Sequence, residues 1–248
     1  MRHHYLAGVL AGGVALGSGS ALATPLQFIT NGSFETGNLS GWSVGGPLVM
    51  GNCPSQGRNW NVSASGSATG CSAVANPVDG RYAAYVMNDG FAWTSYTLSQ
   101  NFLVPDDVSV DTAILSWMDS SVSGYSGTPR VFSVDFLLGT TRLDNVFSYK
   151  VPFIDGNAAW EIRSFDVSAI LSAHTGETLT LRYTNYIPEN WRGAGGFGLD
   201  GVSLMADLAP LAKLAPPSAI SEPASLGLLG VGLLALAQFR RRSPATTD

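Results

Sequence analysis

The sequence predicts an all-β protein, an antiparallel β-sandwich. Apolar and polar residues alternate with period two in several short segments, and dipeptides typical of turns separate these segments. No part of the central chain keeps a helical period. Gly, Ser, Thr, Asn and aromatic residues are plentiful and Lys is nearly absent, a mixture typical of β proteins with many turns.

Five segments carry the strand signal. Residues 131–138 would place Phe132, Val134, Phe136 and Leu138 on one face, and residues 178–184 would do the same with Leu179, Leu181 and Tyr183. Residues 113–118 are apolar on both faces, and residues 81–87 and 94–104 complete the set. We expect one short helical turn, over residues 168–174. Many short strands at this spacing predict a sandwich.

The N-terminal 23 residues predict a secretory signal peptide. They combine a basic start at residues 2–4, an apolar stretch at 5–16 and the small-x-small pattern Ala21-Leu22-Ala23. Signal peptidase would cut between Ala23 and Thr24. The alternative is an uncleaved N-terminal anchor, but the glycines and the A-x-A pattern favour cleavage.

The exported part predicts one domain over residues 24–207, followed by a Pro/Ala-rich linker over 208–220. Residues 24–221 contain nine Lys and Arg and sixteen Asp and Glu, a net charge of −7. Such an acidic surface argues against nucleic acid and anionic lipid as partners. Cys53 and Cys71 are the two cysteines, and we expect them to form a disulfide in an oxidising compartment.

Catalytic motifs are missing from the sequence, so we expect a protein that is not an enzyme. After signal removal a Ser-His-Asp arrangement would depend on His174 alone, which lies in a surface turn. Residues 193–198 match G-x-G-x-x-G, but they lead into a strand rather than a helix. A glycan-active enzyme with paired carboxylates is the distant alternative.

The C-terminus, residues 221–248, combines three signals. Glu222-Pro223 precedes an apolar run over about 224–239, which predicts a single helix, and Arg240, Arg241 and Arg242 follow. The run is short for a spanning helix, which needs about 20 apolar residues. By the positive-inside rule the arginines would stay cytoplasmic and the sandwich outside.

This tail closely resembles the PEP-CTERM sorting tail, with Ser221 where the first Pro of the Pro-Glu-Pro triplet usually stands. The resemblance implies recognition by an exosortase, a membrane enzyme thought to cut near the triplet. It also implies an exported protein of a Gram-negative cell envelope or extracellular matrix, held transiently in the inner membrane by the helix. A permanent single-span anchor is the alternative.

Two further motifs carry a second resemblance. Residues 31–37 (NGSFETG) with Gly41-Trp42 look like an opening strand, and residues 197–204 (FGLDGVSL) like a closing strand; YTLSQNFLV at 96–104 lies between them. Together they resemble galactose-binding-like jelly-roll domains, especially carbohydrate-binding modules found beside xylanases and glucanases. The resemblance covers residues 26–206 and implies a jelly-roll sandwich in which the first and last strands are neighbours.

That resemblance also implies a structural calcium ion where those two strands meet. Glu35 and Asp200 would be ligands, with the backbone near Asn31 or Ser33 as a helper. Calcium takes six to eight oxygen donors, which carboxylates and carbonyls supply. The alternative is that both carboxylates accept hydrogen bonds from turn amides.

Sugar recognition in such modules uses exposed aromatic rings and nearby polar side chains. Candidate rings lie in polar, Gly-rich surroundings: Trp60, Trp93, Trp191, Tyr125 and Tyr186. Asn190 and Arg192 flank Trp191 and make it the preferred candidate, whereas Trp42, Trp117 and Trp160 are expected in the core. The alternative is that the loop rings pack against the sandwich edge.

We therefore expect an exported, non-catalytic protein that binds extracellular polysaccharide. The alternative is a purely structural protein of a biofilm or envelope, without a sugar site.

Overall fold

The computed structural model describes residues 24–47, 59–66, 74–88, 92–123, 130–151, 158–188 and 195–210. By its contacts the chain divides into two units, 1–210 and 211–248, and all described residues belong to the first. The predicted signal peptide, the Cys53–Cys71 disulfide and the apolar helix of the tail lie outside the described residues.

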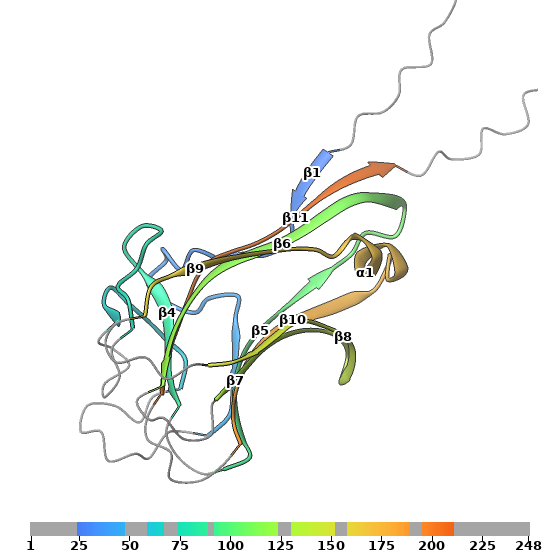
Figure 1. Cartoon of the computed structure of the whole chain (residues 1–248). Helices are drawn as coiled ribbons and strands as arrows, with labels where there is room; N and C mark the ends of the chain where they lie inside the picture. Colours follow the sequence, from blue (N-terminus) through green and yellow to red (C-terminus); the bar gives the residue numbers. More distant parts are fainter. Residues whose placement is uncertain are drawn as a thin grey trace, which may run out of the picture. The chain divides into compact units, whose positions relative to one another are not determined.

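Within the described ranges, two antiparallel sheets make a β-sandwich, as predicted (Figure 1). The six-stranded sheet has the order β3-β4-β11-β6-β9, and β1 also pairs with β11. Its strands are β1 (Thr24–Gln27), β3 (Asn61–Ser63), β4 (Ala83–Asn88), β6 (Val108–Ser123), β9 (Glu161–Asp166) and β11 (Gly195–Pro210). The five-stranded sheet has the order β2-β5-β10-β7-β8, formed by β2 (Ser43–Gly45), β5 (Thr94–Leu103), β7 (Val131–Leu138), β8 (Thr141–Lys150) and β10 (Thr178–Ile187).

The expected strands are confirmed, and so is the helical turn, which is α1 (Ser168–Ala173). Edge strand β8 was not predicted, because two register shifts against β7 break its alternation of apolar and polar residues. Strand β11 continues to Pro210, three residues beyond the predicted domain end, because Leu208 pairs with Val110 and is buried. Within the described ranges, no helix is long and apolar enough to cross a membrane.

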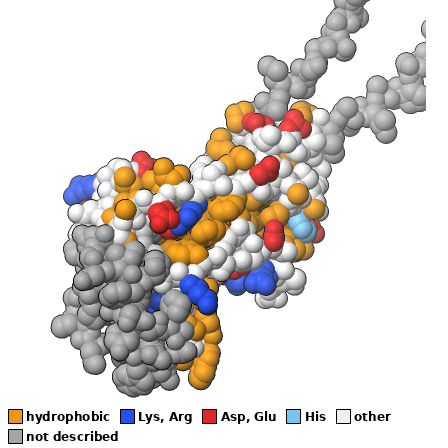
Figure 2. Space-filling model, viewed as in Figure 1, with side chains coloured by type: hydrophobic (Ala, Val, Ile, Leu, Met, Phe, Trp, Pro, Cys, Tyr) orange, Lys and Arg blue, Asp and Glu red, His pale blue; other side chains and the backbone are white. Residues whose placement is uncertain are grey.

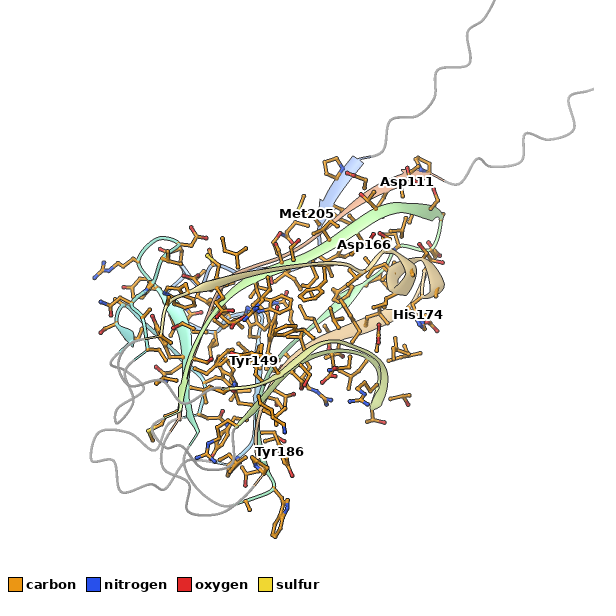
Figure 3. The ribbon with its side chains drawn as sticks, viewed as in Figure 1. Asp111, Tyr149, Asp166, His174, Tyr186 and Met205 are labelled. Atoms are coloured by element: carbon orange, nitrogen blue, oxygen red, sulfur yellow. The ribbon has the colours of Figure 1, made fainter. Side chains whose placement is uncertain are left out.

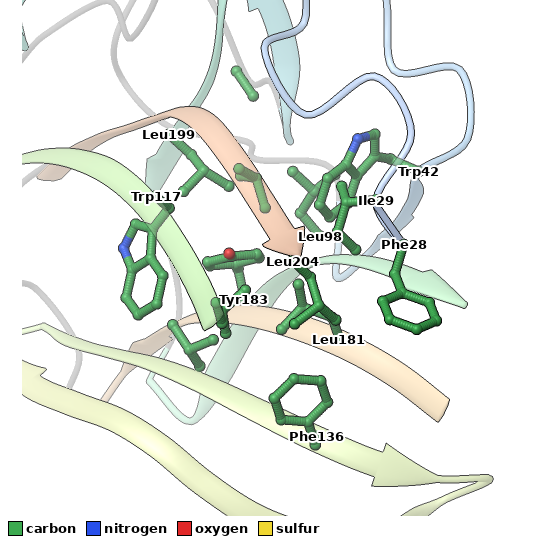
Figure 4. Packing of buried hydrophobic residues seen from close by; sticks show 14 of the residues in the cluster. Phe28, Ile29, Trp42, Leu98, Trp117, Phe136, Leu181, Tyr183, Leu199 and Leu204 are labelled. Atoms are coloured by element: carbon green, nitrogen blue, oxygen red, sulfur yellow. The ribbon is translucent and has the colours of Figure 1, made fainter. Parts of the chain in front are cut away.

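The core fills the space between the two sheets. Trp117, Leu199 and Leu204 of the six-stranded sheet face Leu181 and Phe136 of the five-stranded sheet (Figure 4). Aromatic rings contribute much of the buried surface, and such rings pack favourably at short separation. The ring centroids of Phe132 and Phe197, for example, are 4.2 Å apart across the sandwich.

The first and last strands are neighbours, as the resemblance implies: in β1 and β11, Leu26 pairs with Ala206. The NGSFE motif, expected in the opening strand, instead forms tight turns after β1. Asn31 and Phe34 have φ values of 51° and 58°, a left-handed conformation that cannot continue a strand. Gly32 packs so closely that a Cβ there would lie 1.9 Å from the carbonyl oxygen of Val202.

Two other motif residues fasten these turns to the sandwich. The Gln100 side chain accepts a hydrogen bond from the Thr30 amide at 2.7 Å and donates one to the Thr30 carbonyl at 2.9 Å. The Trp42 indole donates to the carbonyl oxygen of Asn31 at 3.1 Å. Because buried polar groups need such partners, Gln100 and Trp42 have a structural role: they hold these turns on the sandwich.

Candidate functional site

The outer face of the five-stranded sheet carries a row of small hydroxyl side chains. Thr184 on β10 pairs with Thr97 on β5 and with Ser133 on β7, and Ser133 pairs with Ser148 on β8. In β10, Leu181, Tyr183, Asn185 and Ile187 are buried, so the residues between them, Thr184 included, face outward. The row crosses four strands and provides hydrogen-bonding groups without bulk.

A charged row lies beside it. Arg182 on β10 pairs with Asp135 on β7, which pairs with Asn145 on β8. Asp135 is 3% exposed, and its carboxylate accepts a hydrogen bond from Asn145 Nδ2 at 2.8 Å. Arg182 Nη2 and Arg142 Nη1 each approach it at 3.8 Å, beyond hydrogen-bond distance. One buried carboxylate therefore stands between two guanidinium groups.

On the other side of the hydroxyl row lies Tyr186, which pairs with Ser95 and Val131. Figure 3 shows Tyr186 at the end of the sandwich away from His174 and α1. Trp93, immediately before β5, is 78% exposed, has a φ of 58°, and donates its amide to the Ile187 carbonyl at 2.6 Å. A left-handed, solvent-facing Trp is uncommon and fits a ring displayed for contact.

These rows line a shallow groove of about 400 Å³ that is open to solvent. Its lining comprises Ser95, Thr97, Val131, Ser133, Asp135, Arg142, Asn145, Ser148, Arg182, Thr184 and Tyr186. Two atoms of these residues, Arg182 Nε and Thr184 Oγ1, are buried without a hydrogen-bond partner. Both atoms have almost no solvent-accessible surface, so among the described residues they are incompletely paired positions beneath the groove rather than contacts on its surface.

A second hollow, of about 580 Å³, lies between edge strands β8 and β9. Its buried carboxylate, Asp119, accepts hydrogen bonds from Trp117 Nε1 at 2.9 Å, Arg163 Nε at 3.0 Å and the Tyr149 hydroxyl at 3.3 Å. Arg163 also pairs with Glu161 and lies over the Tyr149 ring. Figure 2 shows acidic and basic side chains in contact here, beside a band of hydrophobic ones.

Burial raises the pKa of Asp119, and the adjacent Arg163 guanidinium only partly offsets this. Burial also raises the pKa of Tyr149, and the Asp119 charge raises it further. Because these groups satisfy one another, we interpret this cluster as a structural closure of the sandwich edge.

The predicted calcium ligands each have protein partners. Glu35 Oε1 accepts hydrogen bonds from the Arg81 and Tyr82 amides, both at 2.8 Å. Asp200 accepts the Asp79 amide at 3.2 Å and the Gly201 amide at 2.8 Å. The two carboxylates thus hold the turn over residues 79–82 from both sides.

Asn31, the proposed helper, donates its side-chain amide to the carbonyls of Asn38 and Ser40 and accepts from Thr36. Among the described residues, no group of three or more His, Cys, Asp or Glu could hold a metal ion. These hydrogen bonds fit the amide-acceptor alternative, and the calcium ion stays a prediction from the resemblance.

The structure separates the predicted sugar-binding aromatics. Tyr186 lines the groove and Trp93 is exposed beside it, but Trp60 is 4% exposed and packs edge-on against Phe197 with centroids 5.8 Å apart. Trp60 is therefore wrong as a sugar-stacking ring: its neighbours in sequence are polar, yet its ring, just before β3, is buried against Phe197. The preferred candidates Asn190, Trp191 and Arg192, and also Tyr125, lie outside the described residues.

Sequence reasoning missed Arg182, Asp135 and Thr184. Their signal was present as the polar half of the alternation in β10 and β7, where Thr180, Arg182, Thr184 and Tyr186 occupy every second position. In the sequence, this pattern predicts no more than the polar face of a strand.

Comparison with known proteins identifies the tail. Residues 219–242 match the model of the PEP-CTERM protein-sorting motif, which confirms the resemblance of the tail. The motif indicates an exported, envelope-associated protein. No curated protein matches the chain.

Solved structures similar to the chain include TmCBM61 in complex with β-1,4-galactotriose (18% identity, 72% of this chain and 97% of that one, TM-score 0.44). They also include a cyclase from Fischerella sp. TAU (18%, 75% and 99%, TM-score 0.48) and a cleaved adhesin domain of Lys-gingipain from Porphyromonas gingivalis (13%, 73% and 97%, TM-score 0.46). At these values the likenesses carry no argument about ligand or activity.

Proposed function

We propose that this exported protein binds polysaccharide through the groove on the outer face of its five-stranded sheet. The observation that carries the proposal is a single groove lined by a charged row, a row of hydroxyl side chains and the ring of Tyr186. Sugar hydroxyls both donate and accept hydrogen bonds, so they can bind the guanidinium, the amide and the hydroxyl groups of this lining.

The aromatic end supplies the complementary contact. A pyranose ring presents C–H groups on its faces, and an exposed aromatic ring offers a flat apolar surface for them. Tyr186 and Trp93 would stack on sugar units at one end while the polar rows bind hydroxyls along the groove. A groove open to solvent on a sheet face suits an extended polymer better than an enclosed small molecule.

The groove favours binding over turnover. Its described lining includes one carboxylate, Asp135, whereas most glycoside hydrolases use two. Asp135 is also buried and bonded to Asn145, which leaves it poorly placed for proton transfer to a ligand. We propose that the protein acts as a non-catalytic binder.

The sorting tail would deliver this binder to its ligand. An exosortase would recognise residues around Glu222-Pro223, the apolar segment would hold the precursor in the inner membrane during sorting, and cleavage would release the sandwich to the envelope or its polysaccharide matrix. Mass spectrometry of the mature protein tests this step, because retention of residues 224–242 would indicate a permanent anchor.

Affinity electrophoresis of the purified full chain through gels containing plant, algal or bacterial polysaccharides tests binding. We expect retardation by at least one polymer, and weaker retardation of Tyr186→Ala and Trp93→Ala. Ile162→Ala is the matched control, since Ile162 is 79% exposed on β9 of the opposite sheet. Unchanged mobility in every gel would favour the purely structural alternative.

A further inference from the structure

We infer that the groove selects acidic polysaccharide, a polymer whose sugar units carry carboxylate groups. This inference rests on the proposed function and narrows it to a class of ligand. It comes from the net charge of the lining, which is positive, whereas the net charge of the protein is negative.

The groove carries an excess of positive charge. Within the part of the chain that the structure describes, its charged lining residues are Arg142, Arg182 and Asp135, two cations and one anion. Residues 24–221 carry a net charge of −7, so a cationic groove is a local departure from an acidic surface. A local excess of positive charge attracts anionic ligands, and Asp135 reduces that attraction without cancelling it.

The single negative charge of Asp135 can balance the positive charge of only one of the two arginines. Asp135 takes its closest hydrogen bond from Asn145 at 2.8 Å and a longer one from Ser133 at 3.4 Å. The closest nitrogens of Arg142 and Arg182 stay 3.8 Å away, too far for the charge-assisted hydrogen bonds that guanidinium and carboxylate normally form. Neither guanidinium is therefore fully engaged by the protein.

Both guanidinium groups can be reached from the groove. The side chain of Arg142 is 63% exposed and that of Arg182 is 34% exposed; Arg182 Nε itself is buried, so the terminal nitrogens of Arg182 would make the contact. A guanidinium presents paired N–H groups that match the two oxygens of a carboxylate. A carboxylated sugar held on the hydroxyl row would bring its charge to the exposed ends of these two groups, whose combined charge Asp135 balances only in part.

The experiment compares polygalacturonate with the same polymer after its carboxyl groups are reduced to hydroxymethyl groups. Both polymers have the same backbone, so affinity electrophoresis of the full chain isolates the charge. We expect roughly tenfold tighter binding to the acidic polymer, as a charge-assisted hydrogen bond contributes about 1.5–3 kcal/mol, and this difference should shrink as salt is added.

Arg142→Gln and Arg182→Gln should each weaken binding to the acidic polymer more than binding to the reduced polymer, and so remove most of this difference. Arg81→Gln is the control, because Arg81 is an exposed cation on the turn held by Glu35. Arg142 is largely exposed, so its variant will fold, and thermal melting checks the fold of the Arg182 variant.

Equal affinity for the two polymers would overturn this inference while leaving the proposed function intact. Failure to bind these or any other polysaccharide would overturn both. Equal loss of the preference in Arg81→Gln would also contradict the inference, because it would assign the effect to net charge.

Discussion

Arg182 and Asp135 face each other on neighbouring strands β10 and β7, with Nη2 and Oδ2 3.8 Å apart and no hydrogen bond between them. A carboxylate so placed lowers the positive charge of the groove without occupying the guanidinium. The pair therefore sets how strongly the groove attracts an anion.

Asp135→Asn should tighten binding to an acidic polysaccharide several-fold and leave neutral polymers unaffected. The substitution keeps an oxygen that can accept from Asn145 Nδ2, so it removes the charge with little change of shape. Affinity electrophoresis at two salt concentrations measures both effects, since the gain should be larger at low salt. Weaker binding to the acidic polymer would show that Asp135 itself binds the ligand.

Thr184→Val should stabilise the protein and leave polysaccharide binding nearly unchanged, because the hydroxyl oxygen is buried. Thr184 Oγ1 is buried without a partner, and replacing such a hydroxyl with a methyl group removes a desolvation cost of about 1 kcal/mol. Thr180→Val on the same strand is the control, because Thr180 Oγ1 donates to Asn101 Oδ1 at 2.7 Å and lies outside the groove. Thr180→Val should lower stability slightly and leave binding unchanged.

Chemical denaturation measures the first effect and affinity electrophoresis the second. A destabilised Thr184→Val would show that the hydroxyl is hydrogen-bonded in the folded protein, and clearly weaker binding would show that the ligand reaches it.

Glu35→Ala should lower the free energy of unfolding by about 1–2 kcal/mol, because it removes the acceptor of two backbone amides. Glu35→Gln retains an acceptor oxygen and should lose less. Gly80 makes the turn sensitive, since its φ is 83° and a Cβ there would lie 2.5 Å from the Glu35 carboxyl carbon.

Melting in EDTA and in calcium separates this account from the calcium prediction. The amide hydrogen bonds alone predict the same melting temperature in both. A calcium-dependent rise that disappears in Glu35→Gln and in Asp200→Asn would instead support a calcium ion bound by these two carboxylates.

The Asp119 cluster predicts a pH dependence of stability. Burial raises the folded-state pKa of Asp119 above its unfolded value near 3.9, so the folded protein binds the proton more tightly. The resulting stability is present at low pH and is lost as pH rises through the folded-state pKa. Burial also raises the pKa of Asp200, to about 6, which adds to the wild-type slope.

Urea denaturation from pH 4 upward should therefore show a smaller decline of stability with pH in Asp119→Asn than in the wild type. This variant should also be less stable at every pH, because Arg163 loses its buried partner. An identical slope in the two proteins would show that Asp119 has the same pKa in the folded and unfolded states.

The sandwich could be predicted from the sequence wherever one face of a strand is buried. Alternation over residues 131–138 and 178–184 reports this directly, and the structure confirms both. Strand β8 could not be predicted from alternation, because its extra residues at the two register shifts change which side chains face inward. Asn31 and Gly32 belong to the motif that carries the family resemblance. Their role in the turns follows only from their contacts with Trp42 and Val202.

The groove could not be predicted in the same way. Thr97, Ser133, Ser148 and Thr184 come together through strand pairing between segments far apart in the sequence, and a polar residue on a strand reads alike whether it faces bulk water or a binding groove. Aromatic residues gave a better signal where their neighbours in sequence are polar or Gly. Tyr186 and Trp93 were predicted from such surroundings, and Trp60, which is buried, shows where the same reasoning fails.

The most direct test of the groove is NMR of the labelled full chain during titration with an oligosaccharide from a polymer that it binds. Our account predicts chemical-shift changes at the amides and side chains of Ser95, Thr97, Ser133, Arg182, Thr184 and Tyr186, with β9 on the opposite sheet unaffected. Changes confined to Tyr149, Glu161 and Arg163 would instead place the ligand between β8 and β9 and contradict the proposed site.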